Sequence, residues 1–284
     1  MKILLTGASG QVGYELERSL QGLGEVVAVD RARMDLADLD QVRDMIRAVR
    51  PGLIVNPAAY TAVDKAESEP ELAHRINAEA PALMAAEARA LGAALVHFST
   101  DYVFDGTKQG AYVETDATNP INVYGASKLA GEQAIAASGV DHLIFRTSWV
   151  YGMRGKNFLL TMLRLSKERE ELRVVADQHG APTWSRTIAD TTALVLAQAR
   201  GQAGWWANNG GIYHLSGQGQ TTWCGFTEAI VAASGARCRV IPIAAAEYPV
   251  PARRPANSVM SSARLMERFC SLPGWDGALR LCME

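Results

Sequence analysis

The sequence is poor in cysteine and offers no paired thiols. Its 284 residues include only four cysteines, all in the last third of the chain and separated by wide gaps without a Cys-x-x-Cys spacing. This arrangement argues against both a zinc site and a disulfide framework. We therefore expect four reduced thiols, at Cys224, Cys238, Cys270 and Cys282.

Long apolar runs and an excess of one charge are also missing. No segment reaches the roughly 20 apolar residues of a membrane span. The first apolar run stops at Gly7, without the longer core and cleavage site of a secretory signal. The 28 Lys and Arg nearly balance the 30 Asp and Glu, and no basic patch suited to nucleic acid stands out. We expect a cytoplasmic protein that binds neither membranes nor nucleic acid.

The first half of the chain alternates short β-branched or apolar runs with longer amphipathic stretches. This pattern is typical of βαβ units, which build a parallel sheet covered by helices on both faces. A long helix is predicted over 71–91, with limits that Pro70 and Pro81 leave open because proline suits only the first turn of a helix. Buried strands are predicted over residues 2–6, 25–30, 53–56, 94–99 and 142–147.

The alternation becomes irregular after Val150. Turns rich in glycine and tryptophan occupy 201–211, and a proline-rich stretch covers 242–255. We predict an α/β fold, a Rossmann-type doubly wound parallel sheet with a smaller C-terminal substrate-binding lobe. The predicted NAD(P)-binding domain comprises 1–150, with 184–205 packing back on it, and the lobe comprises 151–183 and 206–284.

A glycine-rich loop follows the first predicted strand at once and opens a helix. Gly7, Gly10 and Gly13 are spaced three apart, a pattern that differs from Gly-x-Gly-x-x-Gly. Glycines here permit a tight turn, close approach of a pyrophosphate and close packing of the helix on the sheet. The position of the loop predicts a nicotinamide dinucleotide site.

The end of the second predicted strand leaves the choice of cofactor open. Asp30 stands where an acid accepts the ribose hydroxyls of NAD. The adjacent Arg31 can instead bind the 2′-phosphate of NADP. Both residues are also compatible with a plain solvated strand end, so the sequence predicts NADPH or NADH without deciding between them.

Tyr124 and Lys128 lie four residues apart in a predicted helix, so their side chains leave the same face. A tyrosine titrates at about pH 10, and a nearby ammonium together with an oxidised nicotinamide favours the phenolate. The fourth predicted strand ends at Ser99 and Thr100, which places hydroxyl groups at the carboxyl edge of the sheet, where such folds bind ligands. We expect Thr100 to hydrogen-bond a substrate carbonyl that Tyr124 protonates.

These features together resemble the extended short-chain dehydrogenase/reductases, which combine a Gly-x-x-Gly-x-x-Gly loop with a hydroxyl, a tyrosine and a lysine. Further blocks are similar to the dTDP-4-dehydrorhamnose reductases within that family. The resemblance implies reduction of the C4 ketone of dTDP-4-dehydro-L-rhamnose to dTDP-L-rhamnose, a precursor of cell-surface polysaccharide. The blocks that carry it are 56–67, 99–106, 146–152, 177–183, Arg254-Pro255 and Asn257-Ser258.

The resemblance also implies roles for individual residues. Thr100, Tyr124 and Lys128 are the implied catalytic set, with Tyr124 as general acid and Lys128 at the nicotinamide ribose. The resemblance implies further cofactor residues besides the three glycines, Asp30 and Arg31. Gln11 and Val12 are implied at the pyrophosphate, and Asp35 and Leu36 at the adenine. The residues implied after the third strand are Ala58, Ala59, Tyr60 and Thr61. The implied nucleotide-sugar residues are Thr100, Asp101, Trp149, Arg254 and Asn257, where core packing for Trp149 and a surface ion pair for Arg254 stay open.

No metal site is predicted. Some reductases of this type hold Mg²⁺ between acids where two subunits meet, which would recruit Glu15 and the helix after Thr183. Arg186 in that helix places a guanidinium where a carboxylate is wanted. His97 and His214 lack metal-ligand spacing and are expected to be satisfied core or edge residues. The sequence leaves the oligomeric state open, with a homodimer as one option.

Two other functions remain as alternatives. A related nucleotide-sugar epimerase or dehydratase would retain NAD, but a dehydratase needs an acid where Tyr102 follows Asp101. A non-catalytic regulatory subunit, similar to that of methionine adenosyltransferase, would bind cofactor without turnover. The complete set of threonine, tyrosine and lysine argues against the second alternative.

Overall fold

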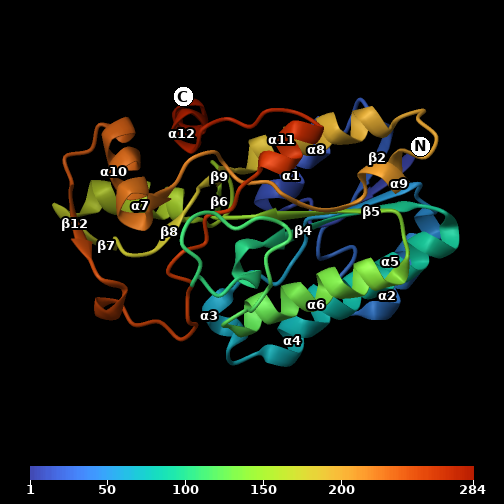
Figure 1. The fold of residues 1–284 in the computed structure, drawn as a ribbon, viewed down its shortest axis with the longest axis horizontal. Coiled ribbons are helices and arrows are strands. Elements are labelled where there is room, and N and C mark those ends of the chain that lie inside the picture. Colours follow the sequence, from blue (N-terminus) through green and yellow to red (C-terminus); the bar gives the residue numbers. More distant parts are fainter.

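A six-stranded parallel sheet lies at the centre of the computed structural model, which describes residues 1–284 (Figure 1). The strand order is β10-β5-β4-β3-β1-β2. All five predicted strands are present within two residues of their predicted limits. The six strands are β1 (Lys2–Leu5), β2 (Glu25–Ala28), β3 (Leu53–Asn56), β4 (Ala94–Thr100), β5 (His142–Thr147) and β10 (Gly211–His214).

The side chains of successive strand residues pack into two separate cores, one on each face of the sheet, because they point to opposite faces. Ile3 and Leu5 pack with α1 (Gln11–Ser19), α8 (Ser185–Ala199) and α11 (Ala263–Arg268). Leu4 packs with α2 (Leu39–Val49), α5 (Ala80–Leu91) and α6 (Val123–Ser138). Figure 1 shows these two groups of helices on opposite sides of the sheet. The predicted doubly wound α/β architecture is confirmed.

The helix predicted over 71–91 contains a widened turn. It runs as α4 (Pro70–His74), the π-helical segment η1 (Arg75–Glu79) and α5. Pro81 has no N–H to donate to the carbonyl of Asn77. At Gly131 of α6, an added Cβ would lie only 2.2 Å from the Asn77 carbonyl oxygen, so the two helices meet closely. The π turn thus accommodates Pro81, which sequence periodicity did not predict.

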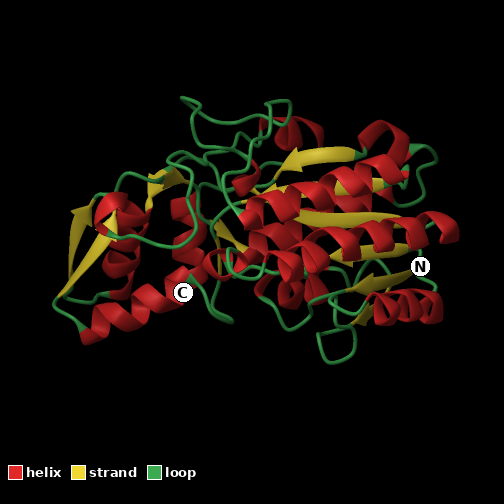
Figure 2. Ribbon diagram, turned by 90° about the horizontal axis from the view of Figure 1, so that it is seen from below, coloured by secondary structure: helices red, strands yellow, loops and turns green.

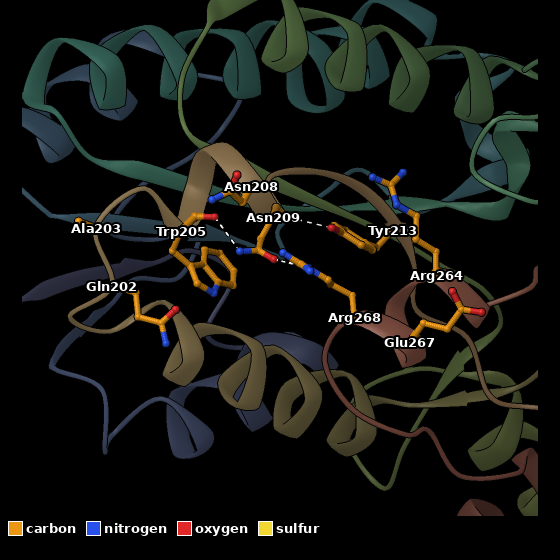
Figure 3. Close-up of a pocket in the computed structure, with 9 residues that line it drawn as sticks. All are labelled: Gln202, Ala203, Trp205, Asn208, Asn209, Tyr213, Arg264, Glu267 and Arg268. Atoms are coloured by element: carbon orange, nitrogen blue, oxygen red, sulfur yellow. Dashed lines mark hydrogen bonds between the residues drawn. The ribbon is translucent and has the colours of Figure 1, made fainter.

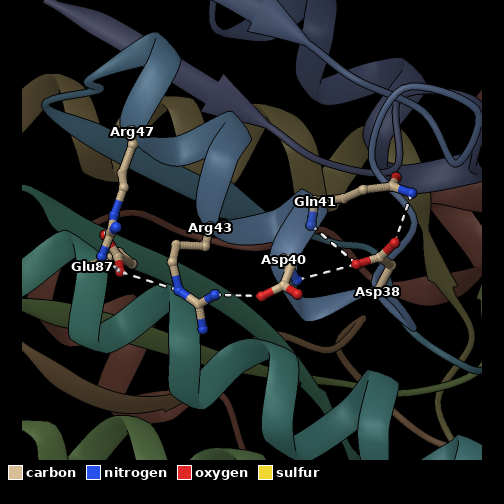
Figure 4. Close-up of polar contacts among 6 residues, drawn as sticks. All are labelled: Asp38, Asp40, Gln41, Arg43, Arg47 and Glu87. Atoms are coloured by element: carbon tan, nitrogen blue, oxygen red, sulfur yellow. Dashed lines mark hydrogen bonds and ion pairs between the residues drawn. The ribbon is translucent and has the colours of Figure 1, made fainter.

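Polar contacts fix α2 at its start and along its side. The Asp38 side chain caps the helix by accepting from the N–H of Asp40 at 3.1 Å. Arg47 donates twice to Glu87 of α5, at 2.8 and 2.7 Å, and Arg43 contacts both Asp40 and Glu87 (Figure 4). These contacts tie α2 to α5 on one face of the sheet.

The smaller lobe has a core of its own at one end of the sheet (Figure 2). The rings of Tyr151 and Phe226 pack at its centre, 5.2 Å apart. Strands β7 and β12 pair in parallel beside them. The lobe is built from β6 (Val150–Tyr151), α7 (Phe158–Glu168), β7 (Glu171–Val175), β8 (His179–Gly180), β9 (Thr183–Trp184), β11 (Thr221–Thr222), α10 (Trp223–Ser234), β12 (Arg239–Ile243) and α12 (Trp275–Met283).

Two segments of the predicted lobe lie with the sheet. Strand β10 pairs with β5, and α11 contributes Leu265 to the core shared with α1 and α8. The glycines at 210 and 211 and the short length of β10 made this region resemble a turn. Helix α8 packs on α1. The division into two domains otherwise stays a prediction. None of the helices has both the length and the apolar character that crossing a membrane requires.

Candidate active site

A cavity of about 570 Å³ lies among the loops that follow β1, β2 and β3. Strand β1 has β2 on one side and β3 on the other, so consecutive crossovers leave in opposite directions and open a crevice at the carboxyl edge. Every predicted cofactor residue except Asp30 lines the cavity: Gly7, Gly10, Gln11, Val12, Gly13, Arg31, Asp35, Leu36, Ala58, Ala59, Tyr60, Thr61, Tyr124 and Lys128.

A second cavity of similar volume lies beside β10, away from these motifs (Figure 3). Three of its polar side chains donate hydrogen bonds to other residues of its lining. Arg268 donates to the side chain of Asn209, whose amide donates to the carbonyl of Trp205 at 2.8 Å. Tyr213 donates its hydroxyl to the Asn209 carbonyl at 3.0 Å. No predicted site residue lines this cavity.

The glycine-rich loop leaves no room for side chains. Gly7 has φ +57°, a left-handed conformation that favours glycine. A Cβ on Gly13 would lie 2.0 Å from the Gly7 carbonyl oxygen, and one on Gly10 would lie 3.2 Å from it. The loop ends at the start of α1, whose first N–H groups point outward without helical partners. This bare backbone and the size of the cavity fit the pyrophosphate of a dinucleotide.

The position of Asp30 differs from the expectation. Its carboxylate accepts from the backbone N–H groups of Ala32 and Arg33, at 3.1 and 3.2 Å, and it does not line the cavity. Strand β2 ends at Ala28, two residues earlier than predicted, so Asp30 caps the next turn. Arg31 does line the cavity, with its side chain 77% exposed and its Nε 3.1 Å from Asp35 Oδ2.

Tyr124 enters the cavity from the first turn of α6. Asn122 caps that helix by accepting from the N–H of Gly125 at 2.7 Å. A Cβ on Gly125 would lie 2.2 Å from the carbonyl oxygen of Tyr102, so the helix start lies directly against the chain after β4. The Tyr124 hydroxyl lies near enough to Thr100 for that side chain to affect its pKa. Thr100 itself does not line the cavity, and its predicted contact with the substrate carbonyl stays a prediction.

Tyr124 keeps its proton at neutral pH. Burial raises the pKa of Tyr124 to about 12, the hydrogen bond with Thr100 opposes the rise, and the Asp101 carboxylate adds to it. Lys128 is not among the groups that shift this pKa in the protein without cofactor, and its expected effect on Tyr124 beside a bound nicotinamide stays a prediction. Lys128 donates from Nζ to the carbonyl of Phe98 at 2.6 Å, within the buried interior.

Lys128 is 1% exposed. Burial lowers the pKa of Lys128 to about 8, and the Glu132 carboxylate opposes that effect. Glu132 is itself buried and paired with Arg146 at 2.7 Å. Lys128 Nζ also lies 3.0 Å from Nε2 of His97. A lysine that titrates this close to neutral pH can change its charge during a proton transfer.

The two core histidines differ from each other. Both ring nitrogens of His97 have partners, since Nδ1 lies 3.1 Å from Asn56 Nδ2 and Nε2 faces Lys128. The expectation of a satisfied core histidine is confirmed for His97. It is wrong for His214, whose Nδ1 lies 3.2 Å from the Ser261 carbonyl while Nε2 has no partner. The contact between His97 and Lys128 was not predicted.

Asp101 is buried next to the catalytic set. Its Oδ1 accepts from Thr100 Oγ1 at 3.0 Å, and Oδ2 has no hydrogen-bond partner. Burial raises the pKa of Asp101 to about 6, and the nearby Ser258 and Thr100 hydroxyls oppose the rise. A buried carboxylate oxygen without a partner is costly, which suits a position where a ligand hydroxyl can donate to it.

None of the predicted substrate residues lines the cavity, Thr100 and Asp101 included. Arg254 donates from Nη1 and Nη2 to Asp64, at 3.0 and 2.8 Å. Trp149 stacks on Trp223 with ring centroids 3.5 Å apart, and its backbone has φ +45°. Asn257 donates to two loop carbonyls, at residues 108 and 110, at 2.8 Å each. The ion pair left open for Arg254 is present. Trp149 is only partly buried, so the core packing left open for it is not observed, and its binding role stays a prediction.

Some cavity residues carried no signal in the sequence. Lys156 lines the cavity from a segment that was assigned to the lobe. Gln11 connects that segment to the glycine loop, because its Oε1 accepts from Asn157 Nδ2 at 2.7 Å. Arg186 lies with its Nε 3.6 Å from Glu15 Oε2. The absence of a metal at that place stays a prediction.

Comparison with known proteins gives consistent matches over the whole chain. The family model described as the RmlD substrate binding domain matches residues 1–284. A dTDP-4-dehydrorhamnose reductase of Burkholderia thailandensis is 53% identical, over 100% of this chain and 98% of the relative. One of Escherichia coli K12 is 46% identical with the same coverage. The crystal structure of a dTDP-4-dehydrorhamnose reductase from Bacillus anthracis in complex with NADP superposes with a TM-score of 0.92, at 36% identity over 99% of this chain and 98% of that one.

Proposed function

The chain belongs to the family of dTDP-4-dehydrorhamnose reductases, and we propose that it reduces the C4 keto group of dTDP-4-dehydro-L-rhamnose to give dTDP-L-rhamnose, with NADPH or NADH as reductant. The observation that carries this proposal is that Tyr124 and Lys128 line the same cavity as the glycine-rich loop. A proton donor and a cofactor site are thereby held in one crevice. This convergence disfavours a non-catalytic regulatory subunit.

Three side chains, those of Tyr124, Thr100 and Lys128, have separate roles in the proposed reaction. A bound nicotinamide supplies the hydride. Tyr124 donates its proton to the carbonyl oxygen as that oxygen becomes an alkoxide, because it is protonated at neutral pH. Thr100 turns its hydroxyl proton from Asp101 to the same oxygen, which orients the ketone. Lys128 holds a positive charge beneath the site that favours the developing phenolate.

The glycine loop and α1 would hold the cofactor pyrophosphate, and Arg31 would face the adenosine end. We propose that Arg31 binds the 2′-phosphate of NADPH, because Arg31 lines the cavity, whereas Asp30 does not and has its Oδ1 engaged by two backbone N–H groups. NADP in the Bacillus anthracis structure is consistent with this assignment.

Replacing Arg31 by alanine should lower the preference for NADPH over NADH about tenfold, because a charge-assisted hydrogen bond contributes roughly 1.5–3 kcal/mol. The preference is measured as the ratio of kcat/KM values for the two cofactors. Arg33→Ala is the control, since Arg33 donates to the carbonyl of Ala28 and lies outside the cavity lining. An unchanged ratio in Arg31→Ala rejects the phosphate role.

The proposed reaction is tested by mixing the purified protein with NADPH and a panel of dTDP- and UDP-linked 4-keto sugars. Absorbance of the reduced cofactor should fall with dTDP-4-dehydro-L-rhamnose and not with the UDP sugars. Isomerised product without net oxidation of cofactor would instead identify an epimerase. No reaction with any sugar, despite cofactor binding, would identify a regulatory subunit. A cytoplasmic location and a homodimer stay predictions.

A further inference from the structure

A chain of four buried side chains runs beneath the cavity, from the end of β1 to α6. Thr6 donates from Oγ1 to Asn56 Oδ1 at 2.6 Å, and Asn56 Nδ2 lies 3.1 Å from His97 Nδ1. His97 Nε2 lies 3.0 Å from Lys128 Nζ. None of the four is more than 1% exposed. Thr6 and Lys128, the two ends of this chain, both line the cavity.

Among these four side chains, the direction of each hydrogen bond restricts the direction of the next. The N–H of Ala58 donates to Thr6 Oγ1 at 3.3 Å, so the single hydroxyl proton of Thr6 is the one given to Asn56. The amide of Asn56 then turns its NH₂ group to His97, whose Nδ1 must accept. A neutral imidazole with a bare Nδ1 carries its proton on Nε2. That proton points at Lys128, which must therefore be a neutral amine in this arrangement.

An ammonium on Lys128 requires the opposite arrangement. It has only protons to offer, so His97 Nε2 must accept and Nδ1 must carry the imidazole proton. Nδ1–H then needs an acceptor, which Asn56 supplies by turning its carbonyl oxygen to His97. The NH₂ group of Asn56 would then donate to Thr6 Oγ1, which frees the Thr6 hydroxyl proton to point elsewhere. The two arrangements differ by one proton. Lys128 carries it in the second arrangement, and the proton comes from water.

We propose that His97 is a positioning residue for the reduction, which holds Lys128 in place and couples its protonation to the orientation of the Asn56 amide and the Thr6 hydroxyl. This inference rests on the proposed function. The register of β3 and β4 sets the geometry, because Asn56 and His97 are direct neighbours in it. The state of Lys128 is thereby linked to a hydroxyl at the foot of the glycine-rich loop, where the cofactor is expected.

The surroundings of Lys128 agree with this role. Burial keeps His97 neutral by holding its pKa well below the usual value, and the charge of Lys128 lowers it further. The other titratable groups near Lys128 are Tyr124 and Glu132 on its own helix, and Glu132 is paired with Arg146 from β5. Among these neighbours, only His97 has a nitrogen that can either donate to Lys128 or accept from it.

Two substitutions at His97 separate the two contacts. Glutamine places an amide near the position of Nε2, so His97→Gln can still face Lys128. Asparagine places its amide near Nδ1, so His97→Asn keeps only the contact with Asn56. His214→Gln is the control for loss of a buried histidine, since His214 is also 0% exposed and does not contact Lys128. Thermal melting of each variant reports the purely structural cost.

The direct test is nuclear magnetic resonance on the full-length protein without ligands. ¹⁵N shifts of His97 distinguish its two tautomers, and ¹³Cε shifts of labelled lysine follow Lys128, assigned by the Lys128→Met variant. We expect the proton of His97 to move from Nδ1 to Nε2 as pH rises through the titration of Lys128, near pH 8. A His97 tautomer that stays the same across that titration overturns the proposal, whether or not the variants fold.

The variants add a second readout. His97→Asn should move the titration of Lys128 about one pH unit lower, since the ammonium loses a partner, a tenfold change in its ionisation constant. The fall of kcat at alkaline pH should move with it. In His97→Gln and His214→Gln, the titration of Lys128 and the alkaline fall of kcat should both stay near their wild-type pH values. An equal shift in His97→Gln and His97→Asn contradicts the proposal. Wild-type protein that reduces no keto sugar refutes the proposed function alone, because the resonance titration needs no substrate.

Discussion

Replacing Tyr124 by phenylalanine is expected to lower kcat about 10³-fold, because general acid catalysis contributes roughly 10²–10⁴-fold. The variant keeps the aromatic ring that lines the cavity and loses only the hydroxyl that gives up the proton. The affinity for NADPH, measured by calorimetry, should therefore stay within about threefold of wild type.

The control for Tyr124→Phe is Tyr213→Phe, which removes another buried phenol hydroxyl at a place far from the cavity. Tyr213 donates to the carbonyl of Asn209 and is 3% exposed. Its loss should change thermal stability by about 1 kcal/mol and leave kcat near wild type. Wild-type turnover in Tyr124→Phe would remove Tyr124 from the role of general acid. A loss of NADPH binding equal to the loss of kcat would show that the hydroxyl serves binding instead.

Replacing Gly13 by alanine should weaken NADPH binding at least about 100-fold. The new methyl group would lie 2.0 Å from the Gly7 carbonyl oxygen, and an atom of the backbone cannot yield as a flexible side chain can. Gly7 already holds a left-handed φ of +57°, so the turn has to open or α1 has to move away from the sheet. Either change displaces the N–H groups that face the pyrophosphate. Calorimetric titration with NADPH measures the loss.

Gly22→Ala is the matched control for Gly13→Ala. Gly22 follows the same helix at its other end, is exposed, and has no atom within 4 Å of an added Cβ. Its substitution should leave the affinity for NADPH unchanged. If Gly13→Ala binds NADPH as tightly as Gly22→Ala does, the loop does not hold the cofactor in the way proposed. Circular dichroism of both variants separates a local change from loss of the fold.

The central architecture could be predicted from the sequence because its signals are local. Continuous apolar runs mark strands inside a sheet covered on both faces, and all five predicted strands are present. The expectation that each is buried is wrong for β2, which lies at the sheet edge and has no buried residue. The glycine spacing follows from the close contact of Gly13 with Gly7, and the spacing of Tyr124 and Lys128 follows from the helical repeat. Each of these features depends on residues only a few positions apart.

The features that were missed depend on contacts between distant segments. The link from Lys128 to His97 requires the packing of α6 on β4, and the link from His97 to Asn56 requires the register of β3 and β4. The π turn accommodates Pro81 at the place where α6 approaches through Gly131. Asp30 is a local exception, because β2 ends two residues early and the Asp30 carboxylate accepts from the N–H groups of Ala32 and Arg33. No local pattern encodes the contacts between distant segments.

The most direct test of the proposed reaction is whether the hydride of the cofactor is transferred to C4 of the sugar. NADPH with both C4 hydrogens of the nicotinamide replaced by deuterium is mixed with the protein and dTDP-4-dehydro-L-rhamnose, and the product is examined by nuclear magnetic resonance. We predict one deuterium at C4 of the sugar for each cofactor consumed, with the label absent from that position in Tyr124→Phe over the same reaction time. Consumption of cofactor without deuterium at C4, or no consumption at all, would contradict the proposed reaction.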